Sequence, residues 1–165
     1  MRAWLWLFAR RSPPGVVGGA VMLLVVLAAA GAGLVSTHDP TRTDAAHTFL
    51  PPGLHHWLGT DHLGRDIYSR ILHGARISLA VGITCSLAGG LAGGAVGLVS
   101  GYVGGPADFL TQPILDVMQG FPLLVLALVM TAALGPSLTT VIVAISVPFI
   151  PRVARVVRAT TLAIR

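Results

Sequence analysis

The sequence contains no lysine, no glutamate and no asparagine, so apart from six histidines its charge comes from eleven arginines and six aspartates. Charged residues make up only 10% of the 165 residues, whereas about a quarter is usual for a soluble domain. Hydrophobic residues make up 54%, and the mean hydropathy is +0.80. The shortage of charge excludes an ordinary soluble domain and predicts an integral membrane protein. The absence of lysine and asparagine also suggests a GC-rich bacterial genome.

The chain has a single cysteine, Cys85, which excludes an internal disulfide and a metal cluster built on cysteine. Its neighbours are small or apolar, so we expect it to be a packing residue. The net charge of +5 invites a nucleic-acid interpretation, but that needs a basic stripe on a soluble surface. Here the arginines flank apolar runs and are better explained as topology signals, so no nucleic-acid partner is predicted.

The first apolar run, residues 16–35, has the length of about 20 residues that a helix needs to cross a bilayer. It is predicted to be the first transmembrane helix, with residues 1–15 as a cytoplasmic N-terminus. A secretory signal peptide is the alternative, since a basic start precedes the run and small residues end it. The run is longer than the usual apolar stretch of about 7–15 residues in a signal peptide, which favours a retained helix.

Residues 36–76 form the one long polar stretch and are predicted to be an external loop with an amphipathic helix. Prolines and glycine in its first half predict irregular structure up to about Leu58. Apolar residues at helical spacing in 66–78 predict a helix lying at the membrane interface and leading into the second span. Asp66 precedes Arg70 by four residues, so these two side chains are expected to pair.

The second span is predicted over residues 77–99, and its glycines recur every four residues. This spacing returns to nearly the same face of a helix, so the glycines form a groove that another backbone can approach closely. Gly90 and Gly94 are expected to widen the groove. The four glycines that define it are Gly89, Gly93, Gly97 and Gly101.

Two further spans are predicted after a turn at residues 104–106. The third begins near Ile114 and ends at Leu134, with Pro122 kinking it or marking its entry. The fourth covers residues 138–150, with Ser137 as its cap, and prolines at positions 148 and 151 interrupt it near its end. The fold class predicted is therefore an all-α integral membrane protein with four transmembrane helices.

The distribution of arginines predicts the orientation. With the N-terminus in the cytoplasm and four spans, seven arginines lie in cytoplasmic segments and four in external ones. Because cytoplasmic loops carry the excess of cations, both chain ends are expected on the cytoplasmic side of a bacterial plasma or inner membrane, in a multi-pass protein.

Residues 58–70, LGTDHLGRDIYSR, and residues 74–79, GARISL, carry a specific resemblance. With further pieces in order at residues 97–105, 121–122, 134–137 and 151–158, they resemble the second, C-type membrane subunit of the dipeptide, oligopeptide and nickel permease family of ABC transporters. The resemblance extends from about Ser36 to the last residue. The signature residues are Gly59, Thr60, Asp61, Gly64, Arg65, Asp66, Arg70 and Arg76.

The resemblance implies the N-terminal part of a six-helix type I importer permease, with 77–165 as a partial permease domain in the lipid bilayer. It implies three kinds of protein partner: a second permease subunit, cytoplasmic ATPases that use ATP and magnesium, and an extracytoplasmic solute-binding protein. The chain itself is expected to bind no cofactor and to have no catalytic residue. The solute is expected to be a peptide or a related small solute, nickel included.

The loop that holds Gly59, Asp61 and Gly64, called the signature loop, is expected to lie outside the cytoplasm. Gly59 and Gly64 are expected to allow turns, and Thr60 or Asp61 to cap a short helix. Two roles remain open for the loop. It either stabilises the fold as a lid over the helix ends or contacts the binding protein directly.

The sequence departs from the family pattern at its end. In relatives, the segment that resembles residues 161–165 is followed by the cytoplasmic EAA loop, which docks in the ATPase, and by further spans. We therefore expect a truncated chain whose transport without that contact is in doubt, and whose missing helices leave the glycine groove or the arginine-flanked fourth helix facing lipid. A nonfunctional remnant is the alternative. The arginines expected near the ATPase docking region are Arg152, Arg155 and Arg158.

Six histidines are the best case for a metal site, since imidazole binds nickel or zinc. Their spacing is irregular, so they are interpreted as satisfied or solvated loop residues, and no metal site is predicted. A metal-binding or scaffold membrane protein that uses this loop remains the second alternative. The histidines are His38, His47, His55, His56, His62 and His73.

Overall fold

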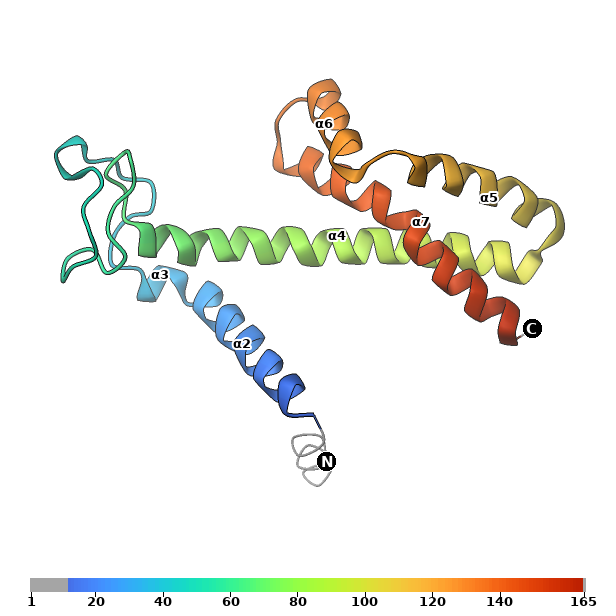
Figure 1. The fold of residues 1–165 in the computed structure, drawn as a ribbon, viewed down its shortest axis with the longest axis horizontal. Helices are drawn as coiled ribbons and strands as arrows, with labels where there is room; N and C mark the ends of the chain where they lie inside the picture. Colours follow the sequence, from blue (N-terminus) through green and yellow to red (C-terminus); the bar gives the residue numbers. More distant parts are fainter. Residues whose placement is uncertain (1–11, 165) are drawn as a thin grey trace. The chain divides into compact units, whose positions relative to one another are not determined.

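The computed structural model describes residues 12–164, and within this range the regular structure is helical apart from an isolated bridge between Thr60 and Asp66 (Figure 1). The chain divides into two compact units, of which the first ends at Leu79 and the second begins at Ala80. Most of the expected cytoplasmic segment 1–15 lies outside the described residues. The all-α membrane class predicted from the sequence is confirmed.

The first unit begins with helix α2, Pro13–Ala30, which continues after Gly31 as the single turn α3, Ala32–Val35. Pro13 occupies the first turn, where its missing N–H costs no hydrogen bond. The leucines of α2 are exposed, and the helix is long and apolar enough to cross a membrane. The predicted first span is thus present, and its helix is interrupted at Gly31.

Helix α4, Ile67–Val103, has 37 residues and no interruption. At 1.5 Å per residue it is about 55 Å long, almost twice the hydrocarbon thickness of about 30 Å. The helix predicted over residues 66–78 is present from Ile67 and leads into the second span without a break. Nothing in residues 67–79 breaks the α-helical hydrogen bonding, so the amphipathic part and the span form one rod.

The glycine face of α4 packs against α7, Leu138–Ile164, within the second unit. A Cβ atom built on Gly93 would lie 2.6 Å from the carbonyl oxygen of Ile150, and one on Gly97 would lie 2.3 Å from that of Ala154. Contacts of the same kind occur at Gly89 and Gly101. The predicted close-packing groove is confirmed at all four positions.

The groove is filled by α7 of the same chain, so of the two surfaces expected to face lipid, the glycine groove and the fourth helix, the groove is excluded. Gly90 and Gly94 do not widen it either, because a Cβ atom at these positions would meet nothing within 4 Å. They lie on another side of α4, since one residue corresponds to a rotation of about 100° around the helix.

The residues in contact advance together along the two helices. Gly89 meets Phe149, Gly97 meets Ala154 and Gly101 meets Thr161, so α4 and α7 run parallel. Parallel neighbours require the connecting segment to return over the length of the pair. This return is made by α5, Gly105–Gly120, and α6, Leu123–Leu134.

The return segment differs from the predicted third span. Helix α5 begins at Gly105 and not near Ile114, and the two helices are bent by 89° about a break at residues 121–122. Of the two roles predicted for Pro122, it does not kink one continuous helix but stands directly before α6 and marks its entry. By length and composition α2, α4 and α7 can each cross a membrane, and α5 with α6 makes up to a fourth crossing if the bent pair counts as one.

Helix α7 continues through Pro148 and Pro151, which the sequence predicted would interrupt it. Each proline removes one helical hydrogen bond, a loss that tight packing against neighbouring helices tolerates within a membrane. Pro151 is fully buried. The predicted cap is confirmed, because the Ser137 hydroxyl accepts the amide hydrogen of Thr140 at 3.0 Å. Cys85 is buried and its thiol donates to the carbonyl of Ile142, in agreement with a packing role.

Candidate functional site

The signature loop, residues 36–66, closes on two glycines with positive φ. Gly59 has φ +78° and Gly64 has φ +71°, a conformation that favours glycine. A Cβ atom on Gly64 would lie 1.8 Å from the carbonyl oxygen of Asp44, and one on Gly59 would lie 2.3 Å from that of Leu50. The expected turns are present. Both glycines also allow the earlier segment of the loop, at Asp44 and Leu50, to pass close to their backbone.

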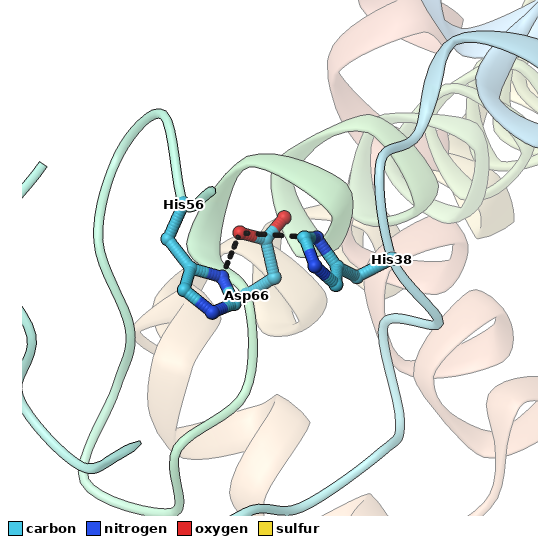
Figure 2. Close-up of side chains that lie close together, drawn as sticks. All are labelled: His38, His56 and Asp66. Carbon is cyan, nitrogen blue, oxygen red and sulfur yellow. Dashed lines mark hydrogen bonds and ion pairs between the residues drawn. The ribbon is translucent and has the colours of Figure 1, made fainter. Parts of the chain in front are cut away.

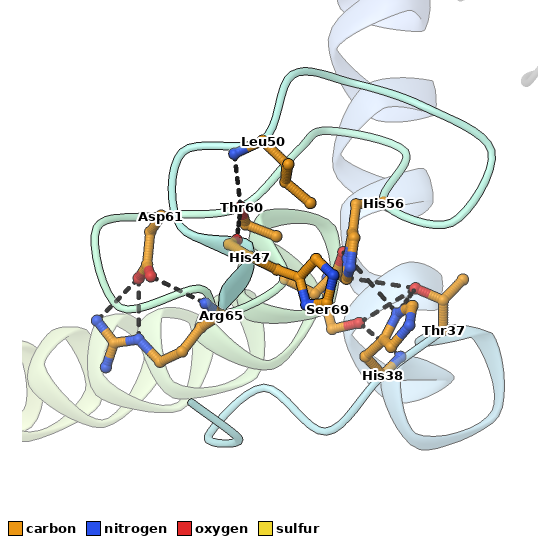
Figure 3. A network of polar contacts seen from close by, with 10 residues as sticks. Thr37, His38, His47, Leu50, His56, Thr60, Asp61, Arg65 and Ser69 are labelled. Carbon is orange, nitrogen blue, oxygen red and sulfur yellow. Dashed lines mark hydrogen bonds and ion pairs between the residues drawn. The ribbon is translucent and has the colours of Figure 1, made fainter. Parts of the chain in front are cut away.

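Thr60 joins these two passes of the loop (Figure 3). Its buried hydroxyl donates to the carbonyl of His47 at 2.6 Å and accepts the amide hydrogen of Leu50 at 2.8 Å. Thr60 is therefore a cross-link inside the loop and not the helix cap that the sequence predicted.

Asp61 organises the turn that contains Gly64. Its carboxylate accepts the amide hydrogens of Leu63 and Arg65, at 2.8 and 3.0 Å, and the guanidinium of Arg65 at 2.9 Å. Arg70 pairs with the same carboxylate. Burial raises the pKa of Asp61, but the two amides and the guanidinium outweigh it and hold the pKa well below the ordinary value of 3.8.

The predicted pair of Asp66 with Arg70 is wrong, because Asp66 stands directly before α4 and caps it. Its carboxylate accepts the amide hydrogen of Ser69 at 2.8 Å, as an N-cap aspartate does. The side chain is then turned away from Arg70, which is left to pair with Asp61. The cap thus comes from Asp66, where Thr60 or Asp61 was predicted.

Two histidines from distant parts of the loop face the Asp66 carboxylate (Figure 2). His56 Nδ1 lies 2.9 Å and His38 Nδ1 lies 3.9 Å from Asp66 Oδ1. Asp66 is 2% exposed, so burial raises its pKa, but the Ser69 hydroxyl and amide, His56 and His38 together bring the pKa below 3.8. Within residues 12–164, no buried side-chain nitrogen or oxygen atom lacks a hydrogen-bond partner.

These lowered pKa values predict that the loop is sensitive to acid. Asp61 and Asp66 stay deprotonated in the folded loop at a pH where the unfolded chain, with carboxyl pKa values near 3.8, already binds protons. Their stabilisation is therefore complete well above pH 3.8 and is lost as the pH falls below that value. The protection of the Asp44 and Thr60 amides against hydrogen exchange, relative to the intrinsic rate at each pH, is expected to fall below about pH 4. Protection that stays constant down to pH 2 would contradict this assignment.

Ser69 and His73 do not form a nucleophile and base with Asp66. His73 Nδ1 faces the main-chain carbonyl of Ser69 at 3.0 Å, while the Ser69 hydroxyl accepts the amide hydrogen of His38 at 3.1 Å. The hydroxyl thus has no imidazole placed to take its proton. The remaining signature residue, Arg76, is exposed on α4.

A second polar cluster lies within the second unit, where α4, α5 and α7 meet. Asp108 receives a two-pronged ion pair from Arg158, with Nε–Oδ1 and NH2–Oδ2 distances of 2.6 and 2.5 Å. The buried Ser100 hydroxyl donates to the Asp108 carboxylate at 2.6 Å. The side-chain amide of Gln112 donates both to the Ser100 hydroxyl and to the Asp108 carboxylate. Arg155 pairs with Asp116, two turns after Asp108 on α5. The cluster fastens α5 to α7 in antiparallel orientation.

Sequence reasoning missed this cluster. Two of the arginines expected near an ATPase docking region, Arg155 and Arg158, are paired within the chain, and Arg152 lines a small cavity beside Gln119. A signal was available in the sequence. Polar residues recur every four positions at 108, 112 and 116 in α5, and arginines recur every three positions at 152, 155 and 158 in α7. Which helix faces which could not be inferred without the fold.

Comparison with known proteins gives consistent matches. Residues 4–52 match the N-terminal transmembrane domain of oligopeptide transport permease C. The chain is 39% identical to a glutathione transport system permease protein of Pectobacterium atrosepticum over 161 residues, which are 97% of this chain and 54% of the relative.

Two further relatives are named for dipeptides. A probable D,D-dipeptide transport system permease protein of Escherichia coli is 37% identical over 98% of this chain and 54% of its own length. A dipeptide transport system permease protein of Bacillus subtilis is 36% identical over 97% of this chain and 50% of its own length. The chain therefore spans about half the length of the curated relatives it matches.

Proposed function

We propose that the chain is a C-type permease of the dipeptide, oligopeptide and nickel family and that it serves as a membrane-spanning subunit of an ABC importer for peptides or a related small solute. The observation that carries the proposal is the match along 97–98% of the chain to permeases of dipeptides and glutathione. The relatives are transport proteins, and ATP hydrolysis would belong to partner ATPases.

The packing of the second unit supports a path through the membrane. Parallel α4 and α7, joined by α5 and α6, give an arrangement in which one helix crosses, the bent pair returns and α7 crosses again. With the N-terminus in the cytoplasm, the signature loop and the turn at 135–137 lie outside, and the polar cluster of Asp108 and Arg158 lies on the cytoplasmic side. The excess of arginine at residues 152–165 agrees with this orientation.

The signature loop has features of both roles left open by the sequence. Its hydrogen bonds make a firm structure over the N-terminal end of α4, as a lid requires. It also displays apolar side chains to solvent, with Leu54 97% exposed and Phe49 and Trp57 more than half exposed. Such an apolar set on an ordered loop suits contact with an external solute-binding protein.

Uptake measurements test the proposal. Interrupting the gene that encodes this chain is expected to abolish uptake of at least one labelled substrate among dipeptides, tripeptides, glutathione and nickel, because the path loses one membrane subunit. A plasmid copy of the intact gene should restore uptake. Unchanged uptake of all four classes, in cells where the other subunits are expressed, would contradict the proposal.

A further inference from the structure

The structure brings together two histidines and an aspartate whose ligand atoms all lie within 4.8 Å of one another: His38, His56 and Asp66. They come from three separate segments of the signature loop, and Figure 2 shows both imidazole rings beside the carboxylate. We propose that this triad is a binding site for a divalent transition-metal ion of the zinc class. The proposal does not depend on transport.

The donor set fits such an ion. Two neutral imidazole nitrogens and one carboxylate oxygen suit Zn²⁺ or Ni²⁺, whereas Mg²⁺ and Ca²⁺ prefer oxygen ligands alone. Zinc bonds to nitrogen and to carboxylate oxygen are about 2.0–2.2 Å long, so two ligands of one ion lie at most about 4.4 Å apart. The ligand atoms of the triad lie within 4.8 Å of one another, so small side-chain movements bring them within this limit.

The three ligands are held before any ion arrives. Asp66 is fixed by the Ser69 amide at 2.8 Å, and the His38 and His56 rings stack with centroids 4.6 Å apart. Thr37 bonds both to the second oxygen of Asp66, at 3.4 Å, and to His38 Nδ1, at 3.0 Å. The contacts to the second oxygen of Asp66 leave Oδ1 available to an ion and orient that ligand, whereas Thr37 would release His38 Nδ1 when that nitrogen binds the ion.

An ion would take the place of a proton. His56 Nδ1 and Asp66 Oδ1 are 2.9 Å apart and share a hydrogen. A bound cation would bridge the same two atoms in place of that hydrogen. The ring hydrogen of a neutral His56 would then be carried on Nε2, with no net change in protonation, and the buried carboxylate would gain a cationic partner. Capping of α4 by Asp66 does not require this, since the amide of Ser69 contacts the other carboxylate oxygen.

The site has access and room for further ligands. A cavity of about 380 Å³ opens beside the triad, and all three residues line it. Asp44 and His47 stand on another part of its wall, and the positive charge of Arg42 is offset by the carboxylates of Asp39 and Asp44. Water or a group of the solute could complete the coordination from this cavity.

Equilibrium dialysis with zinc chloride tests the proposal on the full chain in detergent, purified without a histidine tag. The intact protein is expected to bind one Zn²⁺, and His38→Ala and His56→Ala are each expected to weaken binding at least about tenfold. His62→Ala is the matched control, because His62 is an exposed histidine of the same loop outside the triad, and its affinity should be unchanged. Absence of saturable binding by the intact protein, or equal weakening in all three variants, would overturn the proposal.

X-ray absorption on the zinc-loaded intact protein avoids any doubt about folding of the variants. Two imidazole ligands per zinc are expected. A spectrum with oxygen ligands only, or with one imidazole, would overturn the assignment.

Discussion

Replacing Gly97 by alanine is expected to destabilise the α4–α7 pair by about 2 kcal/mol, as overpacking of a filled interface does. The new Cβ atom would lie 2.3 Å from the carbonyl oxygen of Ala154, which is backbone and cannot rotate away. The two helices must therefore move apart along the whole contact. Unfolding in mixed detergent micelles, followed by far-ultraviolet circular dichroism, measures the change in the free energy of unfolding.

The matched control is Gly94→Ala, one turn away on the same helix. A Cβ atom at this position would meet nothing within 4 Å, so only helix propensity should act, and it favours alanine by about 0.5–1 kcal/mol. The two substitutions are thus expected to have opposite signs. Equal effects at the two positions would mean that α7 does not occupy the glycine groove.

Replacing Gly64 by alanine is expected to open the signature loop. A residue with a Cβ atom is strained at φ +71°, at a cost of about 1–3 kcal/mol, and that atom would also lie 1.8 Å from the Asp44 carbonyl oxygen. The hydrogen bond from the Asp44 amide to the Leu63 carbonyl, 3.0 Å long, cannot then persist. Limited proteolysis of the chain in detergent should show faster cleavage between residues 40 and 66.

Gly53→Ala is the control for this substitution. Gly53 lies in the same loop, and a Cβ atom there would meet its nearest neighbour, the carbonyl oxygen of Pro51, at an ordinary 3.9 Å. Its cleavage rate should match that of the unchanged protein. If Gly64→Ala is cleaved no faster than Gly53→Ala, the close approach of the two passes of the loop is wrong.

The features predictable from the sequence were those set by local periodicity. The four-residue step of Gly89 to Gly101 predicted a close helix contact because that step returns to one helix face, and α7 fills it. Ser137 was predictable as a cap because a hydroxyl one residue before a helical run has an amide within reach. Gly59 and Gly64 were predictable as turn residues because glycine adopts positive φ without strain.

The features that failed depend on competition or on distance. Asp66 had two possible partners within one helical turn, and capping the Ser69 amide prevailed over pairing with Arg70. The ion pair of Asp108 with Arg158 joins residues 50 positions apart, so only the fold reveals it. Pro122 was predictable as a kink or as the entry of a span, but neither the 89° bend between α5 and α6 nor the start of α5 at Gly105 has a local signal.

The same distance effect hid the histidine site. The spacing of His38 and His56 along the chain is irregular for a metal site, because the ligands are brought together by the loop and not by one helix or strand. The passes of the loop that position them depend on the Gly64 turn and on the Thr60 cross-link.

Cysteine accessibility in intact cells tests the central claim most directly, since the account requires alternate crossings. Single cysteines at the exposed positions His62, Pro106, Pro136 and Thr160 would be introduced after Cys85→Ser. A membrane-impermeant maleimide should label positions 62 and 136 from outside, and positions 106 and 160 only after the membrane is opened. Labelling of 62 and 106 from the same side, or of 136 and 160 from the same side, would contradict the proposed path of α4, α5, α6 and α7 through the membrane.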